Sequence, residues 1–128
     1  MSRHGLVLFG HGARDARWAE PFERLAAKLR AARGADAPVS LAFLELMEPS
    51  LQDAVAALAA QGCDAVTVVP VFFGQGGHVR RDLPRLVDAC RTAHPGLALD
   101  CATAVGEDDT VLDAIALYCL QQAAGSRP

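Results

Sequence analysis

Four runs of apolar, mostly β-branched residues alternate along the chain with segments whose apolar residues recur at helical spacing. Each run is long enough for a strand, and each is nearly continuous in its apolar residues. Such runs are typical of strands that are buried on both faces of a parallel sheet. The runs are "LVLFG" from Leu6, "VSLAFL" from Val39, "AVTVVPVFF" from Ala65 and "LALDCATAV" from Leu97.

The segments after these runs predict four helices, because their apolar residues recur every three or four positions. The residues concerned are Trp18, Phe22, Leu25 and Leu29, then Leu51, Val55 and Leu58, then Val79, Leu83, Leu86 and Cys90, and finally Leu112, Ile115 and Cys119. The order βαβαβαβα predicts an α/β fold with an open four-stranded parallel sheet flanked by helices. For a short doubly wound sheet of this kind we expect the strand order 2-1-3-4.

Capping residues support the expected boundaries. Ser50 precedes a helical segment with Asp53 three residues later, which is typical of a helix N-terminus. Gly34 and Gly62 follow the first two helical segments, as glycines at helix C-termini do. Pro70 interrupts the third strand run, where either a bulge or an amide position that faces an open edge would accommodate it.

Length and composition indicate one domain, over residues 1–128, with a frayed tail at 125–128. The chain has 128 residues, 52% of them hydrophobic, which suits a single core. It has no apolar run of about 18 residues and no secretory segment in "MSRHGLVLFGHGARD", so we expect a cytoplasmic protein that does not enter a membrane. The four separated cysteines, in mostly apolar surroundings, are expected to be buried thiols.

The charge pattern favours a small-molecule ligand over a nucleic acid. The net charge is −3, and only 5% of the residues are aromatic. The chain therefore lacks the basic stripe and stacking rings that nucleic-acid binding proteins use. We expect no nucleic-acid partner.

Three polar residues are expected at one end of the sheet. His11 follows the first strand, Glu45 the second, and His78 the third after a glycine-rich loop. In open parallel sheets ligands bind beyond the carboxyl ends of the strands, and neighbouring strands lie about 4.8 Å apart. These side chains could therefore converge on one atom, although Glu48 competes with Glu45 for the role. Two imidazoles with a carboxylate suit a divalent ion such as Co²⁺, Fe²⁺ or Ni²⁺.

Neighbouring residues add a possible binding surface for an anion. Gly76 and Gly77 let a bulky ligand approach the backbone, and Arg14, Arg80 and Arg81 lie in the same turns. Each residue also has a simpler interpretation: turn histidines often only bind the backbone, and arginines of this kind are more often surface charges.

Two other features have structural interpretations. His4 in "RHG" precedes the first strand and is expected at the opposite end of the sheet. Phe72 and Phe73 are expected in the core, although Phe73 is close enough to the turn to stack on a flat ring.

The stretch "GHGARD" from Gly10 is echoed by "GHVRRD" from Gly77. The repeat spacing is about half the chain, which a duplicated βαβα unit would produce. Two similar strand-to-helix turns that arose independently would produce it equally well, so both origins stay open.

Three longer stretches resemble the CbiX/SirB family of sirohydrochlorin chelatases. The family pattern is a strand followed by GHGSR, then FLE-x-x-x-PS, then P-x-F-x-x-x-G-x-H-x-x-x-D-[IL]-P. The matching stretches are "LVLFGHGARDARWAEPFERLAAKLR", "LAFLELMEPSLQDAVAAL" and "VTVVPVFFGQGGHVRRDLPRLV". Ala13 replaces the serine of the pattern.

The resemblance implies an ATP-independent chelatase, a lyase that inserts a divalent metal into sirohydrochlorin on the route to cobalamin or siroheme. The metal, with cobalt first and iron or nickel as alternatives, is a substrate, and no organic cofactor is implied. The resemblance puts metal-binding and catalytic roles on His11 and His78, and a catalytic role on Glu45. It also implies a homodimer, because the chain has about half the length of the two-domain members. The alternative is a non-catalytic carrier of metal or tetrapyrrole that uses the same two histidines.

Overall fold

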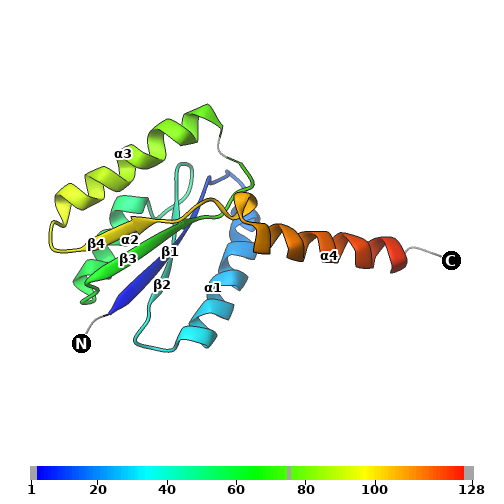
Figure 1. Ribbon diagram of the computed structural model, residues 1–128. Coiled ribbons are helices and arrows are strands. Elements are labelled where there is room, and N and C mark those ends of the chain that lie inside the picture. Colours follow the sequence, from blue (N-terminus) through cyan, green and yellow to red (C-terminus); the bar gives the residue numbers. More distant parts are fainter. Residues whose placement is uncertain (1–2, 75, 126–128) are drawn as a thin grey trace.

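A four-stranded parallel sheet forms the centre of the molecule (Figure 1). The computed structural model describes residues 3–74 and 76–125. The strands are β1 (His4–Gly10), β2 (Val39–Phe43), β3 (Ala65–Pro70) and β4 (Ala98–Cys101), in the order β2-β1-β3-β4. The predicted α/β fold and strand order are confirmed.

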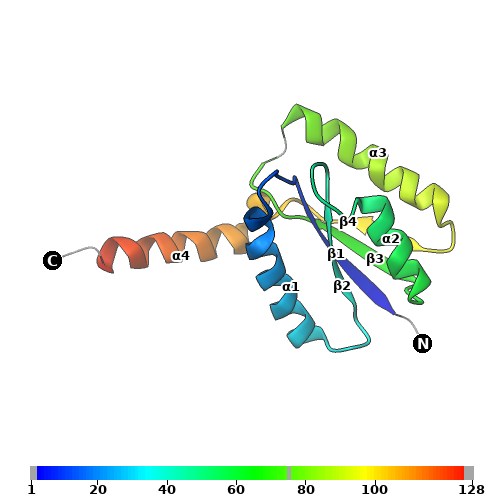
Figure 2. The same cartoon turned by 180° about the vertical axis from the view of Figure 1, so that it is seen from behind.

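The helices are distributed unequally around this sheet (Figures 1 and 2). One face carries α1 (Glu20–Arg33), which is preceded by the 3-10 helix η1 (Ala16–Ala19). The other face carries α2 (Leu51–Ala60) and α3 (Gly77–Ala93). After a second 3-10 helix, η2 (Val105–Glu107), α4 (Asp109–Gly125) projects away from the body. Of the tail expected at 125–128, Gly125 is instead the last residue of α4, and residues 126–128 lie outside the described part.

The larger core lies between the sheet and the α2 and α3 helices. Val7 and Phe9 of β1 are fully buried on this face, and Leu8 is buried on the opposite face beside Ala26 of α1. The expectation of burial on both faces is therefore right for β1. It is wrong for β4, where Leu99 is the buried residue and both neighbours are exposed, because no helix covers the outer half of the α1 face within residues 3–74 and 76–125.

The first helix begins later than its apolar pattern suggests. Trp18 lies in η1 with 36% of its surface exposed, and Leu25 is equally exposed. The buried residues of α1 are Phe22 and Ala26, with Leu29 packed partly against the same cluster. The small side chain of Ala26 lets α1 approach the sheet closely. The prediction missed this residue because it considered only the spacing of large apolar residues.

The capping predictions are confirmed. Ser50 Oγ accepts a hydrogen bond from Asp53 N at 3.1 Å and so begins α2. Gly34 and Gly62 follow α1 and α2 with φ values of 90° and 91°, a region that L-residues with a Cβ rarely adopt.

Replacing Ser50 with alanine is expected to lower the free energy of unfolding by about 1 kcal/mol, because the amide of Asp53 loses its side-chain acceptor. Urea denaturation of the two proteins measures the difference. Ser50→Asn, which keeps a capping oxygen, should retain most of the stability. Equal losses for both substitutions would show that the cap contributes nothing.

Pro70 is accommodated without a bulge. Val71 N donates to Phe9 O at 2.8 Å, and Ala102 N donates to Val68 O at 2.8 Å. Because successive residues of a parallel strand face opposite neighbours, the nitrogen of Pro70 is directed towards the β4 side. The strand β4 ends at Cys101, opposite Val68, so the missing N–H of Pro70 leaves no ladder bond unmade. Of the two expected solutions the bulge is not used, and the nitrogen of Pro70 lies past the end of β4 although β3 is an inner strand.

Backbone groups that face outward at both edges of the sheet form hydrogen bonds with arginine side chains or with a loop. On the outer side of β2, Arg30 Nη2 donates to Val39 O at 2.8 Å, and Phe43 N donates to Pro49 O at 2.9 Å. On the outer side of β4, Arg91 donates from both Nε and Nη2 to Leu99 O.

The cysteines divide into two pairs. Cys63 and Cys90 are buried, as expected, and desolvation raises the pKa of both thiols. Cys101 and Cys119 are exposed, which corrects the prediction for these two. They lie on the edge strand and on the projecting helix, where little of the chain covers them.

None of the helices in the described part of the chain combines the length and the apolar character that a membrane span requires.

Candidate functional site

His11 and Glu45 meet where β1 and β2 end. Leu44 N donates to Gly10 O at 2.9 Å, and Glu45 N donates to His11 O at 3.2 Å. These bonds continue the β1–β2 pairing beyond the strands and hold the two residues side by side. Their side chains contact each other, with 3.2 Å between His11 Nε2 and Glu45 Oε1, and about half of each is exposed. The pair is therefore open to a ligand.

Gly12 makes this close approach possible. Its φ is +99°, and a Cβ at this position would overlap the carbonyl oxygen of Glu45. Only glycine avoids both the unfavourable backbone region and the collision. The residue after His11 must therefore be glycine, because the loop between β2 and α2 packs directly against the turn after β1.

An aromatic cluster lies beneath the turn. The rings of Trp18 and Phe22 have centroids 4.9 Å apart, and Phe43 packs edge-on against both. A Cβ on Gly10 would lie 2.7 Å from the Phe22 ring. This packing supports the ends of β1 and β2 and so supports the two residues that follow them.

The start of α3 lies at the same end of the sheet (Figures 1 and 2). Gly76 is the N-cap of α3, Gly77 its first residue and His78 its second. The side chain of His78 is outside the described part of the structure. Among the side chains that are described, no group of three potential ligands could hold a metal, so the described site consists of the pair His11 and Glu45.

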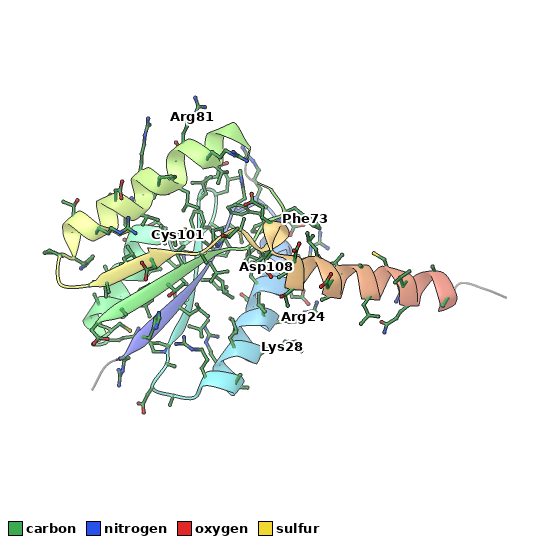
Figure 3. The ribbon with its side chains drawn as sticks, viewed as in Figure 1. Arg24, Lys28, Phe73, Arg81, Cys101 and Asp108 are labelled. Carbon is green, nitrogen blue, oxygen red and sulfur yellow. The ribbon has the colours of Figure 1, made fainter. Side chains whose placement is uncertain are left out.

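The arginines predicted near the site differ in their surroundings. Arg14 is exposed and has no hydrogen bond or ion pair with any described residue. Arg80 lies in the first turn of α3, where its N–H donates to Gly76 O at 3.0 Å. Arg81 extends away from the sheet (Figure 3), and the described structure does not bring it towards His11.

A further arginine, Arg17, holds the turn after His11. Its guanidinium binds both carboxylate oxygens of Asp15, at 2.8 to 3.2 Å, and its backbone N–H donates to the same carboxylate. The Arg17 side chain and N–H hold the pKa of Asp15 below its ordinary value. The capping contact is therefore present at neutral pH and is lost as acid titrates the carboxylate through its lowered pKa.

The two similar stretches of sequence have different structures. "GHGARD" forms a loop that ends at Asp15, the cap of η1, whereas "GHVRRD" forms the first turns of α3. His11 directly follows a strand, and His78 lies inside a helix. The two stretches are therefore similar in sequence but differ in backbone conformation.

Two apolar residues at this end of the molecule, Leu46 and Phe73, are exposed. Leu46, next to Glu45, has a φ of 67° and is 58% exposed. Its left-handed backbone is unusual for a residue with a branched side chain, and no local pattern predicted it. Phe73 is 65% exposed, which corrects its assignment to the core, whereas Phe72 packs on Phe9 as expected.

The structure also distinguishes the two acids that the sequence offered as candidates, Glu45 and Glu48. Glu45 is the one that contacts His11.

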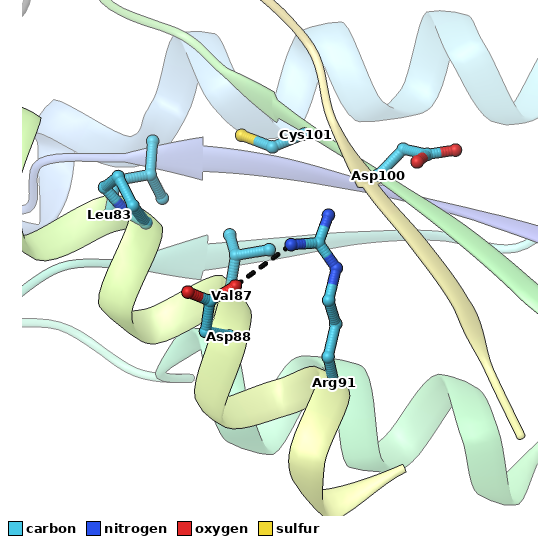
Figure 4. A pocket seen from close by; sticks show the side chains of 7 residues that line it. Leu83, Val87, Asp88, Arg91, Asp100 and Cys101 are labelled. Atoms are coloured by element: carbon cyan, nitrogen blue, oxygen red, sulfur yellow. Dashed lines mark hydrogen bonds and ion pairs between the residues drawn. The ribbon is translucent and has the colours of Figure 1, made fainter. Parts of the chain in front are cut away.

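One hollow of the molecule lies away from the site. A cavity of about 320 Å³ lies between α3 and β4 (Figure 4). Arg91 extends across it and binds Asp88 and the carbonyl of Leu99, so its polar groups already serve the fold. The residues that line it are Leu83, Pro84, Val87, Asp88, Arg91, Asp100 and Cys101, and none of them was predicted as a site residue.

Comparison with known proteins gives one consistent result. The family model CbiX matches residues 5–118. A sirohydrochlorin cobaltochelatase of Methanopyrus kandleri is 38% identical over 82 residues, which are 64% of this chain and 57% of that protein. A sirohydrochlorin cobaltochelatase of Sulfurisphaera tokodaii is 29% identical over 110 residues, 86% of each chain. The matched part thus spans little more than half of the first relative.

Solved structures show the same fold. A CbiX protein from Marinobacter aquaeolei VT8 superimposes with a TM-score of 0.82 at 32% identity, over 96% of this chain and 99% of that one. The sirohydrochlorin chelatase SirB from Bacillus subtilis subspecies spizizenii, solved in complex with cobalt, gives a TM-score of 0.73 at 22% identity. That alignment covers 93% of this chain and 50% of SirB. Because the identity is only 22%, the similarity shows a common fold and no more.

Proposed function

The chain belongs to the CbiX family, and we propose that it is a chelatase that inserts a divalent metal into sirohydrochlorin without ATP. The observation that carries this proposal is the contact between His11 and Glu45 at the carboxyl ends of neighbouring parallel strands. A half-exposed imidazole beside a carboxylate can both bind a metal ion and accept protons. The names of the relatives support sirohydrochlorin as the acceptor.

The proposed reaction exchanges one metal ion for two protons. His11 and His78 hold the incoming ion through imidazole nitrogens, and the negative charge of Glu45 helps to balance the charge of the ion. As the ion passes to the four nitrogens of the macrocycle, the two pyrrole N–H groups lose their protons. Imidazole and carboxylate groups accept these protons and pass them to solvent, which is general base catalysis.

We propose that the rim of the site binds the acidic macrocycle. Sirohydrochlorin carries carboxylates, and guanidinium groups bind carboxylates through paired hydrogen bonds. Arg14 and Arg80 are suited to this task, and Gly76 and Gly77 leave room for the ligand beside the backbone. A similar role for Arg81 stays a prediction from the sequence. The exposed side chains of Leu46 and Phe73 offer apolar contacts for the macrocycle.

Cobalt is the proposed metal, because the curated relatives are named cobaltochelatases. SirB structures contain cobalt or Fe³⁺, and imidazole ligands accept Fe²⁺ and Ni²⁺ as well. The homodimer and the cytoplasmic location expected from the sequence belong to the same proposal.

Purified protein with sirohydrochlorin and Co²⁺ is expected to change the visible spectrum of the pigment faster than Co²⁺ alone at the same pH. The initial rate should rise in proportion to protein concentration. Parallel assays with Fe²⁺ and Ni²⁺ rank the metals. Binding of one metal or one tetrapyrrole per site without turnover would contradict the chelatase and favour the carrier.

A further inference from the structure

Leu46 combines an unfavourable backbone with an exposed apolar side chain. Its φ of 67° lies in the left-handed region, and its side chain is 58% exposed. Glycine, asparagine and aspartate adopt this region most readily, whereas a leucine is strained there. Among the described residues other than glycine, Leu46 alone has a positive φ. Leucine is therefore a poor choice for this position on conformational grounds.

The loop that carries Leu46 requires a reversal of the chain. Phe43 N donates to Pro49 O at 2.9 Å, which closes the base of the loop. Glu45 N donates to His11 O at 3.2 Å, which fixes the residue before Leu46. The chain has to turn back between these two bonds, and the left-handed backbone of Leu46 contributes to that turn. Glycine or asparagine would make the same turn with less strain.

Packing within the chain does not favour leucine at this position either. Leu46 belongs to neither of the hydrophobic clusters that the described residues form. Leu44, two positions earlier, packs against the larger cluster and anchors the loop. Strained residues of this kind gather at sites that bind ligands. We therefore looked for the benefit of the leucine side chain in a contact with another molecule.

Leu46 lies beside the residues that are proposed to bind the metal. It directly follows Glu45, whose carboxylate lies 3.2 Å from His11 Nε2. The loop between β2 and α2 lies at the carboxyl end of the sheet, where β1 also ends (Figures 1 and 2). A metal ion that passes from His11 to the four nitrogens of a macrocycle requires one flat face of the macrocycle to lie over this pair. Leu46 is then next to that face.

We propose that Leu46 is a substrate-binding residue that contacts the apolar face of the tetrapyrrole, and that leucine is kept there although it lowers the stability of the free protein. This inference rests on the proposed function. Burial of about half of a leucine side chain against the macrocycle strengthens binding by about 5- to 10-fold. Binding sites commonly keep residues that destabilise the protein without its ligand.

A role in positioning Glu45 explains leucine less well. Glu45 is held by its N–H bond to His11 O and by the packing of its carbonyl oxygen against Gly12. Glycine or asparagine at position 46 would preserve both contacts, because either residue adopts the same φ more readily. What distinguishes leucine is the apolar side chain beyond Cβ, and this is the part that a ligand can contact.

The test measures stability and macrocycle binding separately in Leu46→Gly and Leu46→Asn. Both variants are expected to raise the Tm by about 1 to 4 °C, because they relieve the backbone strain. Both should bind metal-free sirohydrochlorin about 5- to 10-fold more weakly than the wild type. The single tryptophan of the chain, Trp18, lies in the aromatic cluster beneath the turn, and quenching of its fluorescence by the bound pigment gives the Kd without metal insertion.

Two further variants show whether the effect belongs to this side chain. Leu46→Met restores an apolar side chain of similar length and should bring the Kd back towards the wild-type value. Leu25→Ala removes a partly exposed leucine side chain from α1 and should leave the Kd unchanged. The ratio between the Kd values of Leu46→Gly and the wild type should be the same at low and high salt, because ions do not screen an apolar contact.

Wild-type affinity in Leu46→Gly would overturn the proposal. A lower Tm in both Leu46→Gly and Leu46→Asn would also overturn it, because leucine would then support the fold. Unchanged binding with a lower kcat would assign Leu46 to the positioning of Glu45 and would contradict the contact.

Failure of the chelatase proposal gives a different result. A wild type that binds sirohydrochlorin without inserting Co²⁺ would contradict the chelatase, while the ratio of Kd values still decides the role of Leu46. A wild type that binds no sirohydrochlorin would overturn both proposals.

Discussion

Replacing His11 with alanine is expected to lower the rate of Co²⁺ insertion into sirohydrochlorin by about 10²- to 10⁴-fold, the range that a lost general base produces. The imidazole of His11 lies 3.2 Å from the Glu45 carboxylate. Its loss removes one proposed metal ligand and one proton acceptor together. The spectrum of the pigment gives the initial rate, and a metal titration of the variant should show weaker Co²⁺ binding.

The matched control is His4→Ala. His4 lies at the amino end of β1, where Nε2 contacts Thr67 Oγ1 at 2.7 Å, at the opposite end of the strand from His11. This variant should insert metal at nearly the rate of the wild type. If His11→Ala keeps the wild-type rate while it folds normally, the proposed site is wrong.

Replacing Gly12 with alanine is expected to impair both folding and activity. A backbone held in an unfavourable region costs about 1 to 3 kcal/mol, and the collision with the Glu45 carbonyl adds about 1 to 3 kcal/mol. The loop relieves the collision only if Glu45 moves away from His11. Displacement of a reacting group by about 1 Å can reduce a rate a hundredfold. Urea denaturation and the insertion assay measure the two effects.

Gly34→Ala separates backbone strain from displacement of the site. Gly34 has a similar φ of +90°, but no atom lies within 4 Å of the position that its Cβ would take. This control should lose about 1 to 3 kcal/mol of stability and keep its activity. Equal loss of activity in both variants would mean that Gly12 acts only through stability.

The sequence predicted the sheet well because its signals are local. The runs from Leu6, Val39 and Ala65 identify their strands without knowledge of their neighbours, and Ser50 and Gly34 mark helix ends through contacts within a few residues. The strand order followed from the alternation of strands and helices together with the usual winding of such sheets.

Predictions that depended on tertiary packing were less accurate. The spacing of Leu112 and Ile115 predicted a helix correctly, but spacing cannot show whether a helix packs on its own sheet or projects from it. Trp18 fits the helical pattern and lies in η1 instead, because Asp15 begins a 3-10 turn there.

The site was partly predictable for the same reason. The positions of His11 and Glu45 at strand ends follow from the topology. Their contact does not follow from the register of β1 and β2, which places Leu44 opposite His11, and depends instead on the loops beyond the strands. The backbone conformation of Leu46 depends on how the β2–α2 loop closes, and no short pattern encodes that closure.

The occupied edges of the sheet affect how this protein behaves when it is concentrated. An open edge strand can pair with a strand of another molecule and so begin a polymer. Here Arg30 and Arg91 bind outward carbonyls of β2 and β4, and the loop at Pro49 takes an outward amide. Strand addition at these points would first have to displace a guanidinium group or unfold the loop. Native molecules should therefore resist fibril formation through their edges.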